Sequence, residues 1–194
     1  MLIILCGESG SGKDAMLKRM VDDGCTPIIS TTSRPIRDGE TDGVEYNFVT
    51  KAQFEQMIKD DKLIEYRTYN TLVGGVPDTW YYGATKEELD DNKVYVVILD
   101  IEGAKAFISH FGKKRCFVTY MLVDERTREK RARMRGSFDK TEWDRRLEAD
   151  RKVFTTEAVD EIADAIVRNN CTLDECWRSI REKFAAYCYQ NAYR

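Results

Sequence analysis

The sequence has no long apolar run and few residues of the kinds that bind transition metals. No stretch reaches eighteen consecutive apolar residues and no charged-then-apolar leader is present, so we expect neither a membrane span nor a signal peptide. The single histidine is His110, and the six cysteines show no Cys-x-x-Cys spacing. A zinc site is therefore not expected, and the default expectation is a cytoplasmic protein with reduced thiols.

The chain also lacks internal repeats and a strong net charge. Its 194 residues carry a formal charge of −3, with 42% hydrophobic and 34% charged residues. That balance is typical of an ordinary globular protein and predicts no general affinity for nucleic acid or an anionic membrane. The length fits one domain with room for small inserted subdomains, and it gives no indication of oligomeric state.

What the chain does have is a glycine-rich stretch between an apolar run and a helical pattern. Residues 7–14 read Gly-Glu-Ser-Gly-Ser-Gly-Lys-Asp, after the apolar residues 2–5 and before residues 15–20. In a strand–loop–helix context, G-x-x-x-x-G-K is typical of a phosphate-binding loop, or P-loop. Its amides can turn toward an anion, a helix beginning near Lys13 adds its positive dipole end, and Lys13 can reach the β- and γ-phosphates. The alternative is a glycine-rich turn that binds nothing.

One position departs from the usual P-loop pattern. Asp14 stands where Ser or Thr normally places a hydroxyl on Mg²⁺. A carboxylate there could ligate the cation directly or through water, and could repel the phosphates when no metal is present. We therefore expect unusual metal dependence.

The remaining pattern predicts an α/β fold. Buried-type apolar runs alternate with helical segments, which implies crossover connections and a parallel sheet with helices on both faces. The expected strands are 2–5, 27–31, 94–99, 117–122 and 163–167, and the expected helices are 15–21, 54–60, 104–111, 125–133, 142–154 and 173–187. Thr172 and Glu175 predict a capping box, and Asp42-Gly43 predicts a hairpin. Because ligands bind beyond the carboxyl ends of such strands, the P-loop, Asp100 and Glu102 should share one rim.

A polar segment after the second expected strand carries the most specific motif. From Ser30 to Phe48 the chain reads S-x-T-S-R-x-x-R-x-G-E-x-x-G-x-x-Y-x-F, with two arginines whose planar forks suit phosphate. Together with the P-loop, this motif resembles guanylate kinase. The resemblance extends over nearly the whole chain and includes Glu65, residues 80–83 and 100–103, the arginine segments 131–136 and 145–147, and Asn169.

The resemblance implies a three-layer P-loop NTPase fold and ATP-dependent phosphoryl transfer to a nucleoside monophosphate (NMP), most simply GMP, with Mg²⁺ as cofactor. It divides the chain into a core (1–30, 86–125 and 152–194), an NMP-binding subdomain (31–85) and a lid (126–151). The implied catalytic residues are Lys13, Arg131, Arg135 and Arg146. Asp14, which departs from the family pattern, is the candidate metal ligand because of its carboxylate. The implied ATP site is Gly7, Ser9, Gly10, Ser11, Gly12, Lys13, Asp14 and Asn169. The implied NMP site is Ser30, Arg34, Arg37, Tyr46, Glu65, Tyr82, Asp100 and Glu102.

The chain departs from the family pattern mainly on the acceptor side. Residues 67–81 are longer than the expected short turn and predict an extended hairpin, Ala84 replaces a usual hydroxyl residue, and the segment after Glu102 is short. Another (deoxy)nucleoside monophosphate is therefore an alternative acceptor. Ribose 1,5-bisphosphate is a second alternative, because the Asp after the P-loop lysine also resembles the ribose bisphosphate kinases related to this family. A non-catalytic binding module is a third class. The charges of residues 126–151 outside the matched arginines, Arg128 among them, are expected to solvate a helix face.

Overall fold

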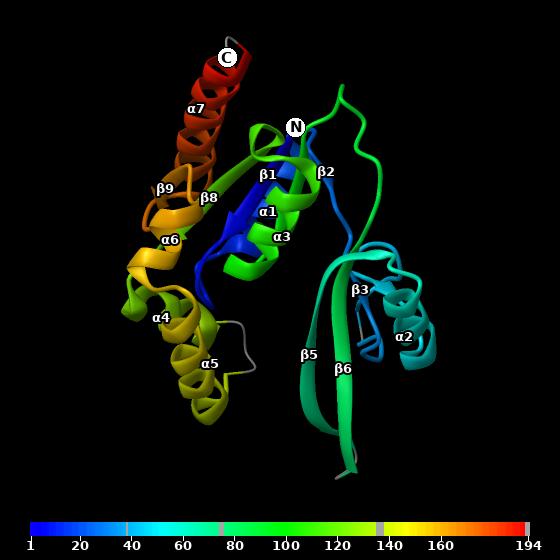
Figure 1. Cartoon of the computed structure of the whole chain (residues 1–194). Coiled ribbons are helices and arrows are strands. Elements are labelled where there is room, and N and C mark those ends of the chain that lie inside the picture. Colours follow the sequence, from blue (N-terminus) through cyan, green and yellow to red (C-terminus); the bar gives the residue numbers. More distant parts are fainter. Residues whose placement is uncertain (38, 74–75, 135–137, 193–194) are drawn as a thin grey trace. The chain divides into compact units, whose positions relative to one another are not determined.

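The apolar run at the start of the chain is the central strand of a parallel sheet. The computed structural model describes residues 1–37, 39–73, 76–134 and 138–192 and is shown in Figure 1. It consists of two units, one made of residues 1–27 and 91–194 and the other of residues 28–90. The expected NMP-binding segment, 31–85, lies inside the second unit.

The first unit is built on a five-stranded sheet in the order β2-β7-β1-β8-β9. Neighbouring strands run parallel, and every residue of β1 is buried. This confirms the predicted parallel α/β core, because two-sided burial is what continuous apolar runs indicate. The strands are β1 (Leu2–Cys6), β2 (Thr26–Pro27), β7 (Tyr95–Ile98), β8 (Cys116–Leu122) and β9 (Ala165–Arg168).

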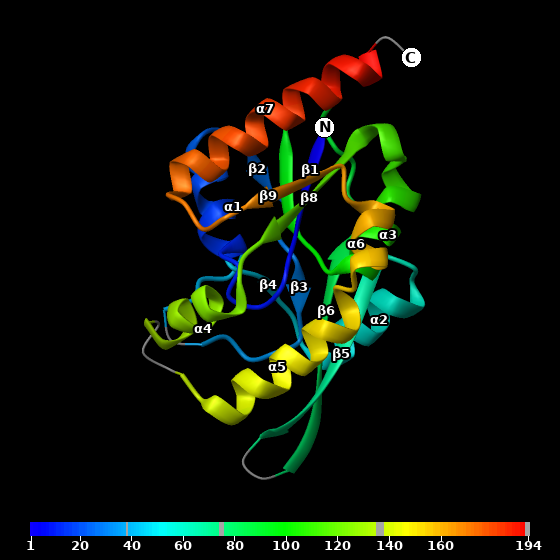
Figure 2. The ribbon, with the colours of Figure 1, turned by 90° about the vertical axis from the view of Figure 1, so that its left-hand side faces the viewer.

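Helices cover both faces of this sheet. Helices α1 and α7 pack against each other on one face, and α3 and α6 pack together on the other, as Figure 2 shows. The Thr172 hydroxyl accepts from the Glu175 amide while the Glu175 carboxylate accepts from the Thr172 amide, so the predicted capping box is confirmed. The elements are α1 (Lys13–Asp22), α3 (Ile101–Phe111), the 3₁₀ turn η1 (Lys113–Arg115), α4 (Glu125–Met134), α5 (Lys140–Val153), α6 (Thr156–Ile162) and α7 (Leu173–Ala192).

The second unit is a four-stranded sheet in the order β4-β3-β6-β5 with one helix. Its long antiparallel pair runs in register from Leu63 opposite Thr85 to Val73 opposite Val76, with a bulge next to Glu65. The two paired strands of the predicted extended hairpin are therefore present, and the turn predicted at Gly74-Gly75 lies outside the described residues. The elements are β3 (Thr31–Thr32), β4 (Asn47–Phe48), α2 (Lys51–Lys59), β5 (Leu63–Val73) and β6 (Val76–Thr85).

Two local predictions were wrong, and one helix was missed. The single strand expected at 27–31 is two strands, because β2 pairs with β7 in the first sheet and β3 pairs in the second. Asp42-Gly43 does not close a hairpin: the Gly43 amide donates to the Tyr46 carbonyl, and β3 and β4 pair in parallel. Helix α6 was not predicted, although the Thr155 hydroxyl caps it by accepting from the Ala158 amide.

Within the described ranges, none of the helices has the length and apolar character that crossing a bilayer requires. The six cysteines are free thiols.

Candidate active site

The glycine-rich loop joins β1 to α1, and two of its glycines are required by geometry. Gly10 and Gly12 have φ of +78° and +92°, a region that L side chains rarely adopt. A Cβ at Gly10 would lie 2.9 Å from the Arg128 carbonyl oxygen, and one at Gly12 would lie 2.8 Å from the Asn169 side-chain nitrogen. Helix α1 begins at Lys13, as predicted. The loop therefore follows the strand–loop–helix geometry expected of a phosphate cradle.

Lys13 points into the loop. Its Nζ donates to the carbonyl oxygens of Gly7 (2.6 Å) and Glu8 (3.0 Å) and to the Ser11 hydroxyl (3.4 Å). Burial lowers the pKa of Lys13 below its ordinary value, and the negative charge of Asp14 opposes that shift. Asp14 itself lies exposed in the first turn of α1. The ammonium is thus centred on the loop, within reach of an anion that the amides would bind.

Arg131 and Asn169 meet at the far end of the loop. The Asn169 side chain donates to the Ser11 carbonyl oxygen at 2.8 Å. Arg131 donates to the same carbonyl at 3.3 Å through Nη1, and to the Asn169 carbonyl at 2.7 Å through Nη2. The structure therefore brings both residues to the P-loop, although the Arg131 guanidinium contacts backbone oxygens there. Arg135, the other arginine expected nearby, lies outside the described residues.

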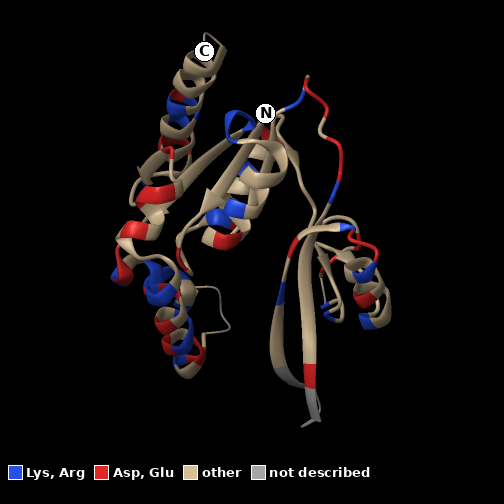
Figure 3. Ribbon diagram, viewed as in Figure 1, with Lys and Arg blue, Asp and Glu red and all other residues tan. Residues whose placement is uncertain are grey.

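Arg146 lies on α5 and shares a carboxylate with its neighbour. Its Nε donates to Glu142 Oε1 at 2.7 Å, and Arg145 donates to both oxygens of Glu142 at 2.7 and 2.8 Å. Helices α4 and α5 carry both signs of charge along their length (Figure 3). Arg146 must therefore exchange Glu142 for a substrate phosphate if it acts in catalysis.

The Glu142 cluster predicts a pH effect. Hydrogen bonds from Arg145 and then Arg146 lower the pKa of Glu142 to about 2. Because the pKa of Glu142 is lower in the folded than in the unfolded protein, its ion pairs contribute fully to folding stability above the ordinary glutamate pKa. This contribution is lost as the pH falls toward 2. All three side chains are over a third exposed, so the contribution to folding is small and salt-screened. A ¹³C NMR titration should give a Glu142 midpoint near 2 that rises in 1 M salt, whereas an ordinary midpoint would contradict the pairing.

Asp100 and Glu102 follow β7, the strand next to β1. Asp100 caps α3 by accepting from the Gly103 amide at 2.7 Å, and its carbonyl lies 3.9 Å from Cys6 Sγ at the end of β1. Asp100 is therefore on the rim shared with the P-loop. Glu102 is exposed and lies 3.5 Å from Lys105 on its own helix.

In the second unit, the arginine motif forms a compact cluster around Arg34. This guanidinium is 3% exposed and makes a two-pronged pair with Glu40 at 2.9 and 2.8 Å, which raises the pKa of Arg34. It lies 5.5 Å from the centroid of the Tyr46 ring, which packs edge-on against Tyr82. Arg37 is exposed and contributes its amide to Glu40. The structure thus unites Arg34, Tyr46 and Tyr82.

Glu65 and Ser30 lie in the same unit. The Glu65 side chain, on β5, is 11% exposed, and its Oε2 lies 3.4 Å from Arg67 Nη1. The Ser30 carbonyl accepts from the Asn47 amide at 2.9 Å, which ties the segment before β3 to β4.

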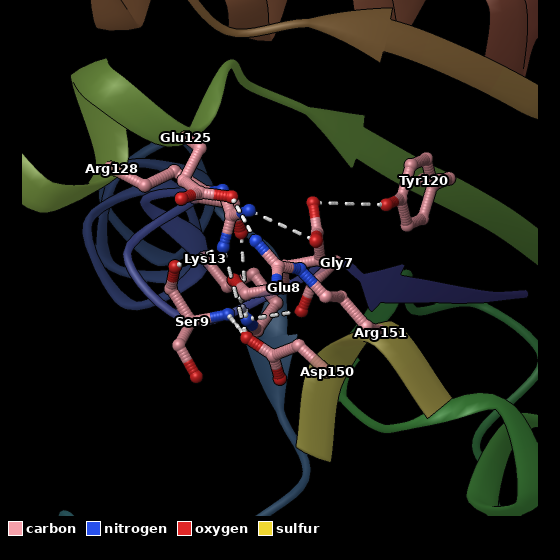
Figure 4. Close-up of polar contacts among 10 residues, drawn as sticks. Gly7, Glu8, Ser9, Lys13, Tyr120, Glu125, Arg128, Asp150 and Arg151 are labelled. Atoms are coloured by element: carbon pink, nitrogen blue, oxygen red, sulfur yellow. Dashed lines mark hydrogen bonds and ion pairs between the residues drawn. The ribbon is translucent and has the colours of Figure 1, made fainter. Parts of the chain in front are cut away.

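The structure also shows four residues at the P-loop that the sequence did not indicate (Figure 4). Arg128 is 3% exposed, so the expectation that it solvates a helix face is wrong. Its Nη2 donates to Glu8 Oε1 at 2.9 Å, and Tyr120 approaches the other Glu8 oxygen at 3.5 Å. Asp150, on α5, accepts from the Ser9 amide at 2.7 Å. The sequence held one signal for this cluster, the carboxylate of Glu8 within the phosphate loop. A buried acid needs a cationic partner, so Glu8 indicated that a basic side chain such as Arg128 lies beside it.

In the ranges that the structure describes, no group of three or more His, Cys, Asp or Glu side chains is placed to hold a metal ion.

A parallel sheet with β1 in the centre, a glycine loop that encloses Lys13, and an inserted second unit define a P-loop phosphotransferase. The sequence model of the family described as guanylate kinase matches residues 1–187. The chain belongs to the guanylate kinase family and is a kinase.

One similar protein supports this assignment, and one solved structure supports the fold. A guanylate kinase from Sulfurimonas denitrificans is 31% identical over 188 residues, which cover 93% of this chain and 84% of that protein. The crystal structure of guanylate kinase from Anaplasma phagocytophilum is similar in fold, with a TM-score of 0.63 at 18% identity, covering 96% of this chain and 85% of that one.

Proposed function

We propose that this kinase transfers the γ-phosphoryl group of ATP to GMP, forming ADP and GDP. The observation that carries the proposal is a lysine-centred P-loop in one unit combined with an Arg34–Tyr46–Tyr82 cluster and Glu65 in the other. The relative at 31% identity is itself called a guanylate kinase. In this proposal, residues 31–85 form the NMP-binding subdomain, residues 126–151 the lid, and the remainder the core.

The donor side needs positive charge and fixed hydrogen-bond donors. Phosphoryl transfer between two anions depends on alignment and charge neutralisation more than on covalent chemistry. Loop amides and Lys13 would hold the phosphates, and Arg131 and Asn169 would support the loop through the Ser11 carbonyl. The proposed donor site also includes Gly7, Ser9, Gly10, Ser11, Gly12 and Asp14.

The acceptor side needs a phosphate grip and a base reader. Arg34 and Arg37, with Tyr46 and Tyr82, would bind the monophosphate, and Arg34 is already held in place by Glu40. Glu65 would accept from guanine N1–H and the exocyclic amine, with Ser30 beside it. Adenine lacks these donors, so a buried carboxylate would discriminate against it. Asp100 and Glu102 are proposed to organise the acceptor or the metal's waters.

The reaction needs no strong general base, because a phosphate monoester is already anionic near neutral pH. Arg135 and Arg146 are proposed to close on the transferring group, where a guanidinium fork matches phosphate oxygens. For Arg146 this requires release from Glu142, which is an exposed and readily exchanged partner.

Mg²⁺ is the proposed cofactor, and when bound with ATP it neutralises charge on the β- and γ-phosphates. Asp14 would suit such an ion, since it offers hard carboxylate oxygen in the first turn of α1, directly after the phosphate loop. Asp14 would hold the ion directly or through a water molecule.

Asp14→Ser should keep the kinase active and shift its divalent-metal optimum. A hydroxyl supplies a neutral oxygen, whereas a carboxylate supplies charge as well, and Mg²⁺ and Mn²⁺ differ in how strictly they require octahedral geometry. Affinity for metal-free ATP should rise in the mutant, because a negative charge beside the phosphates is removed. Calorimetric titrations of ATP with and without Mg²⁺ measure both effects.

Asp22→Ser, at the exposed other end of α1, is the matched control and should leave both titrations unchanged. Equal metal-free affinities in wild type and Asp14→Ser would mean that Asp14 does not face the phosphates.

The proposed reaction is tested by product analysis. Purified protein incubated with ATP, GMP and Mg²⁺ should produce ADP and GDP in equal amounts, separated by anion-exchange chromatography. Formation of ADP without GDP would indicate hydrolysis or another acceptor and would contradict the proposal.

A further inference from the structure

The P-loop already holds an anion that belongs to the chain itself. The Ser9 amide donates to Asp150 Oδ2 at 2.7 Å, across 141 residues of sequence. Backbone amides of such a loop are the groups that bind phosphate. The Asp150 side chain is only 14% exposed, so its carboxylate lies against the loop, as Figure 4 shows.

Arg128 keeps this carboxylate in place. Its side chain is 4% exposed, its Nη1 lies 3.8 Å from Asp150 Oδ2 and donates to the Ser9 carbonyl at 3.2 Å, and its Nη2 donates to Glu8. A buried guanidinium without acid partners is strongly unfavourable. The chain therefore holds Glu8 and Asp150 beside Arg128, and α4 and α5 are both tied to the loop.

These residues balance the charge of the loop from within. Lys13 and Arg128 are cationic, and Glu8 and Asp150 are anionic. Burial raises the pKa of Glu8, Arg128 opposes that shift, and Asp150 adds to it. A phosphate that enters the loop thus finds Arg128 already paired with Glu8 and Asp150. It also finds the Ser9 amide already hydrogen-bonded to Asp150.

We propose that Asp150 competes with the donor's phosphates for the Ser9 amide, and that Arg128 is the positioning residue that maintains this competition. The proposal rests on the function proposed above. A phosphate that takes the amide displaces Asp150, which removes one of the ties between α5 and the loop. Arg146 lies one helical turn before Asp150 on the same face of α5. Donor binding is therefore coupled to the helix that carries a proposed catalytic arginine.

The test is the affinity for metal-free ATP, measured by calorimetry, with kinetics alongside. Asp150→Asn keeps the side-chain shape but removes the charge, so it should tighten ATP binding about fivefold to tenfold, the scale of the difference between a charge-assisted and a neutral hydrogen bond. The KM for ATP should fall while kcat changes less. Glu148→Gln is the matched control: it removes one charge from the same helix, where Glu148 is exposed and pairs with Lys152 on the next turn, and should change neither value.

Equal or weaker ATP binding by folded Asp150→Asn would overturn the proposal. Should the variant not fold, ¹⁵N- and ¹³C-labelled wild type supplies the same test. Metal-free ATP should shift the Ser9 amide and the Asp150 carboxyl resonances together, whereas ATP binding with both resonances unmoved would contradict the competition.

Failure of this inference is distinguishable from failure of the proposed function. A wild type that makes GDP, with Asp150→Asn and wild type binding ATP equally, refutes the competition alone. A wild type that binds ATP through Lys13 but does not phosphorylate GMP refutes the reaction alone.

Discussion

Lys13→Ala is expected to lower kcat/KM for phosphoryl transfer by at least about 10²–10³-fold, the scale of removing one preorganised electrostatic stabiliser. Lys13 is the lysine of the loop, and its ammonium is centred on the Gly7 and Glu8 carbonyls where it can reach a bound phosphate. Alanine is also the best helix former, so α1 should still begin at this position. Steady-state kinetics with ATP and GMP, together with a thermal unfolding curve, measure both expectations.

Lys18→Ala is the matched control, because Lys18 is an exposed lysine of the same helix. It should retain wild-type kinetics. Wild-type activity in a normally folded Lys13→Ala protein would remove the basis for phosphate binding at this loop.

Glu65→Gln is expected to reduce discrimination between GMP and AMP by about 10- to 150-fold, which corresponds to a charged hydrogen bond of roughly 1.5–3 kcal/mol. The side-chain NH₂ of the introduced glutamine would face guanine N1–H or the exocyclic amine, and two donors that face each other cannot form a hydrogen bond. The Glu65 side chain is shielded from most of the solvent, since it is 11% exposed and lies beside Arg67. The ratio of kcat/KM for GMP to that for AMP, at saturating ATP, measures the effect.

Two further measurements define this prediction. The affinity for ATP should not change in Glu65→Gln, because the residue belongs to the second unit. Glu88→Gln, an exposed glutamate of that unit, should leave the GMP to AMP ratio as it is. If the rates with GMP and AMP fall by the same factor in Glu65→Gln, Glu65 does not read the base.

Local sequence signals were sufficient for most of the fold and for the P-loop. The residues that make β1 a buried strand, the glycines that allow positive φ, and the start of α1 at Lys13 all depend on neighbours in sequence. The Thr172 capping box and the β5–β6 hairpin are local as well. Periodicity and turn chemistry therefore predicted them.

Long-range pairing accounts for what the sequence did not reveal. Arg128 reaches Glu8 across 120 residues and Asp150 reaches Ser9 across 141, so the helical pattern around Arg128 gave no sign that its side chain is buried. The segment at 27–31 reads as one strand because propensity cannot tell that its two ends pair in different sheets. Tertiary context decided both cases.

The most direct test of the account is a coupled assay of ADP formation with ATP and a panel of acceptors: GMP, dGMP, AMP, UMP and ribose 1,5-bisphosphate. If Glu65 reads guanine and Arg34 binds the monophosphate, kcat/KM should be highest with GMP and lower with AMP and UMP. In Lys13→Ala, kcat/KM with GMP should fall by at least about 10²–10³-fold. Preference for ribose 1,5-bisphosphate, or no transfer to any acceptor by protein that binds ATP, would contradict it.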